Sequence, residues 1–159
     1  MTRAELSDDG LWSIPGARTK NKRPHIVPLP PLARDILASL PRIEGGFVFT
    51  TTGRTPISGW SKIKGRLDEL MGDVPHWRLH DLRRTAATTM AEIGVAPHIV
   101  EAVLNHISGA KASVAGVYNR AVYAAEKKAA LERWAAYIES IVSGRAGTVV
   151  PLRKGVDRA

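Results

Sequence analysis

Cysteine is absent from this chain of 159 residues, and its absence excludes disulfide bonds, thiol catalysis and cysteine-bound zinc. Long hydrophobic runs are absent too, since no stretch approaches the roughly 20 apolar residues that a membrane-spanning helix requires. The charged start, Met1 to Glu5, is not followed by the apolar region of a signal peptide. We therefore expect one cytoplasmic domain, large enough for its own core, with no membrane partner.

Acidic residues are few relative to basic ones: the chain has 15 Asp and Glu against 23 Lys and Arg, which gives a net charge of +8. A domain with this balance generally binds a polyanion, and nucleic acid is the commonest one. A solubilising surface or association with the ribosome would be the alternative explanation. The charge alone favours a nucleic-acid partner.

The apolar pattern predicts mainly helices. Two short β-type runs, 11–15 and 25–29, flank a basic, turn-rich segment and indicate a hairpin with a basic tip. Phe47 to Thr51 suggests a further brief strand. Helical spacing predicts helices at 31–40, from a cap at Ser58 to about Met71, at about 79–93, 97–106 and 121–141. The fold class is therefore α+β, mainly α-helical, with a small N-terminal sheet packed on a helical bundle.

Two of these helices carry clear apolar stripes. In the helix that ends at Met71 the expected buried positions are Trp60, Ile63, Leu67 and Leu70. Trp77 and Leu79 are expected to pack beneath the helix that follows. In the last helix the apolar positions are Val122, Ala125, Ala129, Leu131, Trp134, Ala135 and Ile138.

The stretch from Arg78 to Thr85 brings a histidine, a carboxylate and two adjacent arginines together at the start of a predicted helix. His80 and Arg83 are three residues apart, so on a helix they share a face. An arginine fork can hold two phosphate oxygens and a histidine can donate to a third, at a helix end that already favours anions. The alternative is a solvated helix start capped by Asp81.

Three further residues attract attention. His106 follows Leu104 and Asn105 at a helix end, Tyr118 lies in a Gly-Val-Tyr-Asn-Arg run, and Lys20 lies at the tip of the basic hairpin. Each alone has a plain structural explanation: a helix cap, a half-buried aromatic and a solvated lysine.

In this order, however, the residues resemble the catalytic domain of the tyrosine recombinases, and more closely the phage and genomic-island integrases. The family pattern His-x-Leu-Arg stands here at 80–83, and its Leu-Gly-His stands at 104–106 with Asn in place of Gly. The segment of the nucleophile stands as Val117-Tyr118-Asn119-Arg120. Lys20 lies eight residues before Pro28, as the family's hairpin lysine does. The resemblance runs from Leu11 to about Ile141.

The resemblance implies DNA cleavage by transesterification without a metal or cofactor. Tyr118 would attack the phosphorus and form a 3′-phosphotyrosyl link, while Arg83 and His106 hold the non-bridging oxygens. His80 would accept or position a proton, and Lys20 would protonate the departing 5′-oxygen. The double-stranded DNA of the attachment sites would be bound by basic residues near this centre: Arg18, Lys22, Arg23, Arg84 and Arg120. Tyr123 is the rival nucleophile, which the family pattern assigns to packing.

The sequence departs from the family in one respect that bears on activity. The family's first arginine lies in a Thr-Gly-x-Arg-x-x-Glu segment, which these 159 residues do not contain, and Arg3 does not take its place. We therefore expect residues 1–144 to form a partial catalytic domain, followed by a basic, flexible tail at 145–159. The family also implies a homo-oligomer on DNA, or association with a full-length recombinase.

Two other functions stay open. One is a DNA-binding remnant of a prophage or genomic-island integrase that occupies attachment sites without cutting. The other is a metal-dependent nuclease built on His76, His80 and His106, for which the sequence offers no accompanying carboxylate cluster.

Overall fold

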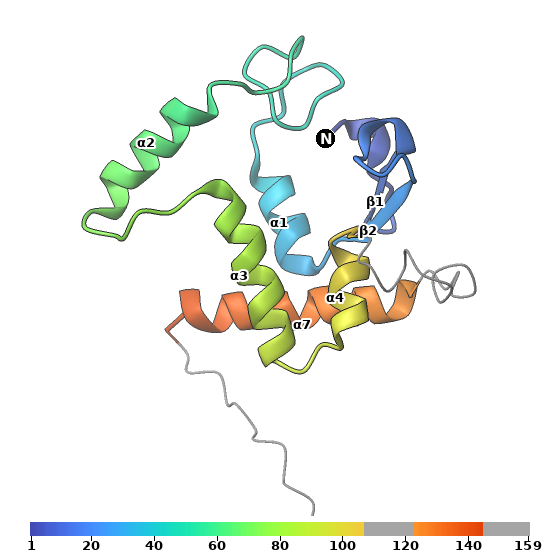
Figure 1. Ribbon diagram of the computed structural model, residues 1–159. Helices are drawn as coiled ribbons and strands as arrows, with labels where there is room; N and C mark the ends of the chain where they lie inside the picture. The colour runs from blue at the N-terminus through green and yellow to red at the C-terminus, as the bar shows by residue number, and fades with distance from the viewer. Residues whose placement is uncertain (107–122, 145–159) are drawn as a thin grey trace, which may run out of the picture.

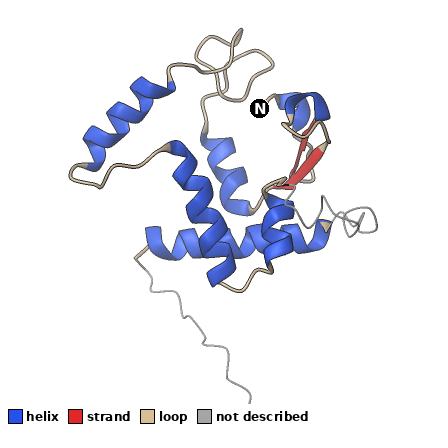
Figure 2. Cartoon of the chain, viewed as in Figure 1, coloured by secondary structure: helices blue, strands red, loops and turns tan. Residues whose placement is uncertain are grey.

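The computed structural model describes residues 1–106 and 123–144. In these residues a small antiparallel sheet lies beside a group of helices (Figures 1 and 2). The elements follow in the order η1 (Arg3–Glu5), β1 (Leu11–Ile14), η2 (Gly16–Arg18), β2 (His25–Pro28), α1 (Pro31–Ser39), α2 (Trp60–Met71), α3 (Leu79–Glu92), α4 (Pro97–Val103) and α7 (Ala124–Val142). The predicted class, α+β and mainly helical, is confirmed.

The N-terminal hairpin forms as predicted. β1 and β2 pair antiparallel, with Leu11 opposite Pro28 and Ile14 opposite His25. The strand predicted at 47–51 is wrong, because only Phe47 pairs, in an isolated bridge with Thr2. The hydroxyl of Thr50 donates to the oxygen of Thr55 and accepts from the N–H of Gly53. These local bonds turn the chain into a loop and take the place of a strand ladder.

The core lies where α3, α4 and α7 meet, and α7 crosses the other two (Figure 1). Its buried side chains come from all three helices and the turn between α3 and α4: Met90, Val95, Ile99, Val100 and Ala130. On α7 the buried positions are Lys127, Ala130 and Ala135, whereas Ala125 and Ala129 are exposed. Of the predicted stripe, Val122 lies outside the described residues, and Ala125 and Ala129 are wrong because the buried face of the first turns centres on Lys127. The second half of the stripe, from Leu131 to Ile138, is correct.

A buried lysine attaches the hairpin to the helices. Lys127 is only 4% exposed, and its Nζ donates to the backbone oxygen of Ile26 at 2.6 Å. A cation buried at this depth needs such a partner. The contact fixes β2 against α7 and so fixes one wall of the site described below.

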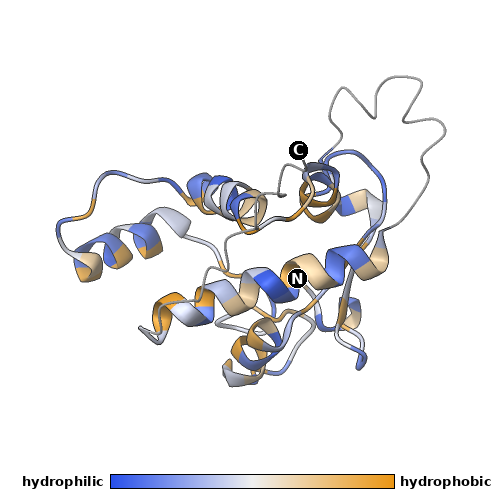
Figure 3. Ribbon diagram, turned by 90° about the horizontal axis from the view of Figure 1, so that it is seen from below, coloured by the Kyte–Doolittle hydropathy of each residue, from blue (hydrophilic) through white to orange (hydrophobic). Residues whose placement is uncertain are grey.

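Helix α2 differs most from expectation. It stands apart from the other helices (Figures 1 and 3), and its predicted stripe is exposed, from 40% at Leu67 to 78% at Leu70. Its N-cap is Gly59, in the left-handed region, and no side chain caps it, so the predicted Ser58 cap is wrong. Amphipathic spacing identifies the face of a helix that suits burial, but it does not supply the partner.

The segment between α2 and α3 also corrects an expectation. Trp77 is half-buried, with the ammonium of Lys64 from α2 4.2 Å from the ring centroid. Leu79 is 45% exposed and does not pack beneath α3 as predicted. The start of α3 is capped as expected, because the N–H of Arg78 donates to Asp81 Oδ2 at 2.9 Å. Among the described helices, none has the length and apolar character needed to cross a membrane.

Candidate active site

A cleft of about 1060 Å³ opens between the hairpin, the first turns of α3 and the end of α4. Four of the predicted catalytic residues line it: Lys20, His80, Arg83 and His106. They come from three regions far apart in the sequence, so the fold collects them. Arg18, predicted to contact DNA, lines the same cleft.

The last turn of α4 forms one wall and ends in a Schellman motif. The N–H of His106 donates to the oxygen of Glu101 at 2.9 Å, and the N–H of Asn105 donates to that of Ala102 at 3.4 Å. Asn105 is left-handed, with φ of 51°. Glycine is commonest at this position and asparagine is the usual substitute, because its short polar side chain tolerates the conformation. The turn therefore forms with Asn105 and aims His106 into the cleft.

Three successive carbonyls at this helix end accept bonds from other elements. The guanidinium of Arg83 donates from Nη2 to Leu104 O at 2.7 Å, and Asn21 Nδ2 reaches Asn105 O at 3.3 Å. His25 Nε2 lies 3.1 Å from Val103 O. A carbonyl only accepts, so His25 carries its proton on Nε2. A helix end leaves its last carbonyls without partners inside the helix, and here they join the hairpin and α3 to α4.

The environment of His25 favours its neutral form. Burial lowers the pKa of His25 below its usual 6.5, and the positive charges of Lys127 and Arg83 lower it further. The bond to Val103 opposes these effects but does not cancel them. His25 therefore acts as a neutral donor in the wall of the cleft.

The hairpin tip is closed by its own polar groups. The hydroxyl of Thr19 lies 3.0 Å from the backbone oxygen of Gly16 and 2.8 Å from that of Arg23, and its single proton is donated to one or the other. The N–H of Lys22 donates to Thr19 O at 3.2 Å. A Cβ at Gly16 would lie 2.5 Å from Lys22 O, so only glycine fits there without movement of the backbone. Lys20 is thereby placed at the corner of a closed turn.

Comparison with known proteins decides the family. The profile of the phage integrase family matches residues 4–124, a span that contains every cleft residue named so far. The chain belongs to the phage integrase family.

Two curated integrases of Escherichia coli (strain K12) are similar to this chain. It is 31% identical to "Prophage integrase IntA" over 137 residues, which are 84% of this chain and 32% of that protein. It is 29% identical to "Prophage integrase IntZ" over 148 residues, which are 91% of this chain and 36% of that protein. The chain thus spans about a third of the length of these relatives. No solved structure matches the chain.

The remaining predicted residues of this chain lie as follows. Tyr118 and Arg120 are outside the described residues. Lys22 and Arg23 are exposed on the hairpin tip, and Arg84 is exposed beside Asp81 at 3.6 Å. The rival Tyr123 packs against the core and against the ring of His98, with ring centroids 5.3 Å apart.

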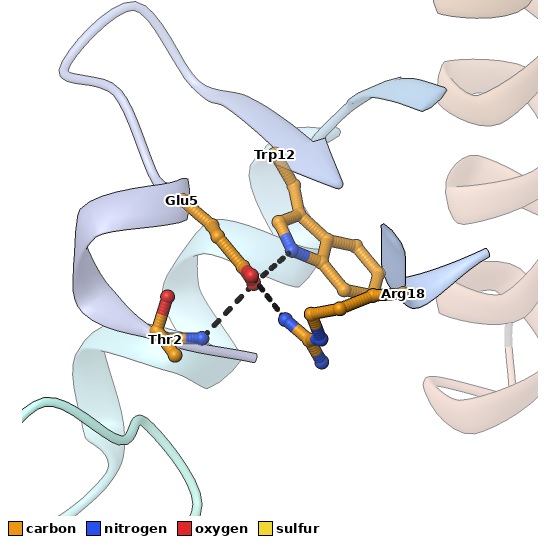
Figure 4. A network of polar contacts seen from close by, with 4 residues as sticks. All are labelled: Thr2, Glu5, Trp12 and Arg18. Carbon is orange, nitrogen blue, oxygen red and sulfur yellow. Dashed lines mark hydrogen bonds and ion pairs between the residues drawn. The ribbon is translucent and has the colours of Figure 1, made fainter. Parts of the chain in front are cut away.

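A buried carboxylate holds Arg18 (Figure 4), which lines the cleft. Glu5 is 9% exposed and accepts bonds from Arg18 Nη1, from Trp12 Nε1 at 3.1 Å and from the N–H of Thr2 at 3.1 Å. The bond from Arg18 contributes most to lowering the pKa of Glu5 to about 2, against the opposing effect of burial. Glu5 therefore stays ionised and orients Arg18.

Sequence reasoning missed Glu5, Asn21, His25 and the side-chain role of Asn105. Two of the contacts involved, Asn21 with Asn105 and His25 with Val103, join residues far apart in sequence, so no local spacing reveals them. The substitution of Asn for the family's Gly at 105 was the one visible signal. Where the structure describes the chain, it shows no group of three His, Asp or Glu side chains placed to hold a metal ion; His76 lines a separate pocket beside Trp77.

Proposed function

We propose that this chain carries the strand-cleaving centre for site-specific DNA recombination and integration, by metal-free transesterification through a 3′-phosphotyrosyl intermediate. The observation that supports it most is the gathering of Lys20, His80, Arg83 and His106 around one cleft. The net charge of +8 suits a nucleic-acid substrate, which we take to be the double-stranded DNA of attachment sites.

The groups of the cleft suit a reacting phosphodiester. Arg83 has five N–H donors, and the bond to Leu104 O uses one of them while fixing the side chain. Its other donors, with His106, would stabilise the negative charge that grows on the non-bridging oxygens. Bonds to a phosphate that strengthen in the transition state are those that accelerate the reaction.

The proton balance involves three residues. The oxygen of Tyr118 would form a bond to phosphorus as its proton passes to His80. The bond from phosphorus to the 5′-oxygen would break as Lys20 donates a proton to that oxygen. The phosphotyrosyl link conserves the bond energy, so the freed 5′-hydroxyl of another strand can reverse the attack without ATP.

Around this centre we assign DNA contacts to basic side chains at the rim and beyond it. On the hairpin these are Arg18, Lys22 and Arg23, and elsewhere they are Arg84 and Arg120. Phosphate contacts of this kind set affinity and register and carry no sequence information directly. We assign residues 1–144 to the catalytic unit and 145–159, which lie outside the described residues, to a basic tail. We place the reaction in the cytoplasm. The chain would act there either as a homo-oligomer on DNA or in association with a full-length recombinase.

The test is covalent capture of DNA. The substrate is a duplex that spans the junction between the genetic element and the chromosome, with a nick a few nucleotides downstream of the cleavage site. After cleavage the short fragment that carries the 5′-hydroxyl dissociates, so religation is prevented and the covalent adduct accumulates. We expect an adduct that resists denaturation, forms in EDTA and is absent with Tyr118→Phe. Tyr123→Phe is the matched control, and it should still form the adduct. An adduct that survives Tyr118→Phe would refute the assignment of the nucleophile.

A second function is favoured by one sequence observation. The 159 residues contain no Thr-Gly-x-Arg-x-x-Glu segment, and loss of one donor to a transition-state oxyanion costs about 10²–10³ in rate. In this case the chain would bind attachment sites without cutting them. A gel shift that weakens steeply with salt, without any adduct, would identify this function.

A further inference from the structure

A side-chain contact joins the hairpin tip to the end of α4 across 84 positions of sequence. Asn21 Nδ2 donates to Asn105 Oδ1 at 2.9 Å and approaches Asn105 O at 3.3 Å. Asn21 directly follows Lys20, and Asn105 directly precedes His106. One amide pair therefore sits between two residues of the proposed catalytic centre.

The amide of Asn21 has only one orientation that satisfies its surroundings. Its Oδ1 accepts the N–H of Arg23 at 3.0 Å. If the amide were reversed, its NH₂ group would face that N–H, and its oxygen would face the two oxygens of Asn105. Asn21 thus closes the tip on one side and reaches α4 on the other, and it is half-buried in doing so.

Asn105 contributes something that the family's glycine cannot. Glycine would adopt the left-handed turn more easily, since φ is 51° here. The backbone of the turn therefore does not require asparagine. Only the side chain provides Oδ1, the acceptor that lies closest to Asn21.

We propose that Asn21 and Asn105 form a latch that holds the Lys20 turn against the end of α4, and that both are positioning residues for the general acid. This inference rests on the proposed recombinase function. The latch fixes the Lys20 turn relative to His106 and Arg83 before DNA enters. The reason is that the hairpin tip and α3 both bond to the end of α4, through Asn21 and Arg83. A general acid that is already placed loses less freedom when the phosphate arrives.

The contact itself is tested by a pair of isosteric substitutions with the same charge change. Asn21→Asp keeps the acceptor for Arg23 N–H but replaces the donor with a carboxylate oxygen that faces two acceptors. Asn105→Asp keeps an acceptor for Asn21. Hydrogen exchange of residues 19–23 in the full chain is measured by mass spectrometry and corrected for intrinsic rates.

The two variants should differ. We expect Asn21→Asp to speed exchange of the tip about 5–10-fold, the effect of losing one hydrogen bond. Asn105→Asp should stay within about twofold of the unaltered chain, since the bond survives. Equal exchange in all three proteins, or faster exchange with Asn105→Asp alone, would overturn the latch.

The effect on catalysis is tested with an uncharged variant. Asn105→Gly keeps the turn and removes the side-chain acceptor. We expect adduct formation on ordinary DNA to fall about fivefold. With a bridging sulfur in place of the 5′-oxygen the fall should disappear, because a thiolate leaves without a proton. Lys20→Ala is the benchmark, with a larger loss that the sulfur also restores. An equal loss on both substrates would overturn the positioning role.

The two tests separate this inference from the proposed function. If the unaltered chain forms no adduct on either substrate, the recombinase function fails, and the catalytic consequence of the latch fails with it. The exchange result still decides whether Asn21 and Asn105 hold the tip.

Discussion

Arg83, on α3, donates from Nη2 to the backbone oxygen of Leu104 at the end of α4, 2.7 Å away. The bond joins the proposed phosphate-binding arginine to the turn that presents His106. A side chain held in this way is preorganised for a phosphate, and its loss would leave a helix-end carbonyl without that donor. Arg83 therefore has both a structural and a chemical role.

Replacement of Arg83 should affect cleavage far more than binding. We expect Arg83→Ala to reduce the rate of adduct formation about 10²–10³-fold at saturating DNA. Arg84→Ala removes the same charge from the next position, where the side chain is exposed, and should weaken DNA binding while cleavage at saturation persists. Comparable losses of cleavage in the two variants would show that charge, and not the placement of Arg83, matters.

Removal of the buried ammonium of Lys127 should destabilise the protein. Lys127→Met deletes the donor to Ile26 O in a part-buried bond, and the loss should cost about 1 kcal/mol. Its neighbour Lys128 is exposed, so Lys128→Met should change the free energy of unfolding by less than about 0.5 kcal/mol. Urea unfolding of both variants measures the difference, and equal midpoints would contradict the anchoring role of Lys127.

Acid should release the Glu5 network. The pKa of Glu5 is lowered from 4.5 to about 2, mainly by Arg18. The unfolded chain therefore binds the proton more readily, and the stabilisation is complete above pH 4.5 and is lost as the pH falls toward 2. Thermal unfolding between these limits should show a pH-dependent loss that Glu5→Gln reduces. Glu132→Gln, at an exposed position of α7, should leave the dependence as it is.

His25 should add a second loss of stability on acidification, in a pH window nearer neutrality than that of Glu5. Because its pKa is lowered below 6.5 by burial, the unfolded state takes up the proton first. The stabilisation is present above pH 6.5 and declines as the pH falls below that value. His25→Gln keeps an N–H donor for Val103 and should remove this decline, whereas His76→Gln, at an exposed position, should not. An NMR titration that places the midpoint of His25 at or above 6.5 would refute the prediction.

The sequence was informative where structure is locally determined. The two short β-type runs around a basic, turn-rich segment predicted the hairpin. Asp81, at the start of the predicted helix, indicated the cap that α3 has. The four cleft residues were found from motif order alone. The hairpin and the helix cap depend on residues that are close in sequence. The cleft residues are distant in sequence, but the order of the family motifs already groups them.

Elsewhere the determining partner was distant or local bonding prevailed. Phe47 and its neighbours have strand-forming side chains, but the hydroxyl of Thr50 closes a loop instead. The stripe of α2 was correctly identified as apolar, yet spacing cannot show that it stays exposed within the described residues. His25 and Asn21 have ordinary polar side chains, and their roles depend on carbonyls that the sequence does not place near them.

The sequence distances across the cleft have a consequence for synthesis on the ribosome. The hairpin contacts residues 78, 84 and 101 positions later, at Val103, Asn105 and Lys127. Translation proceeds from the N-terminus at about 5–20 residues per second, so the hairpin leaves the ribosome several seconds before its supports exist. The turn that carries Lys20 is synthesised before the residues that hold it in place. Contacts of such long range form late in folding, and the nascent hairpin therefore lacks these three supports until the end of α4 and then α7 emerge.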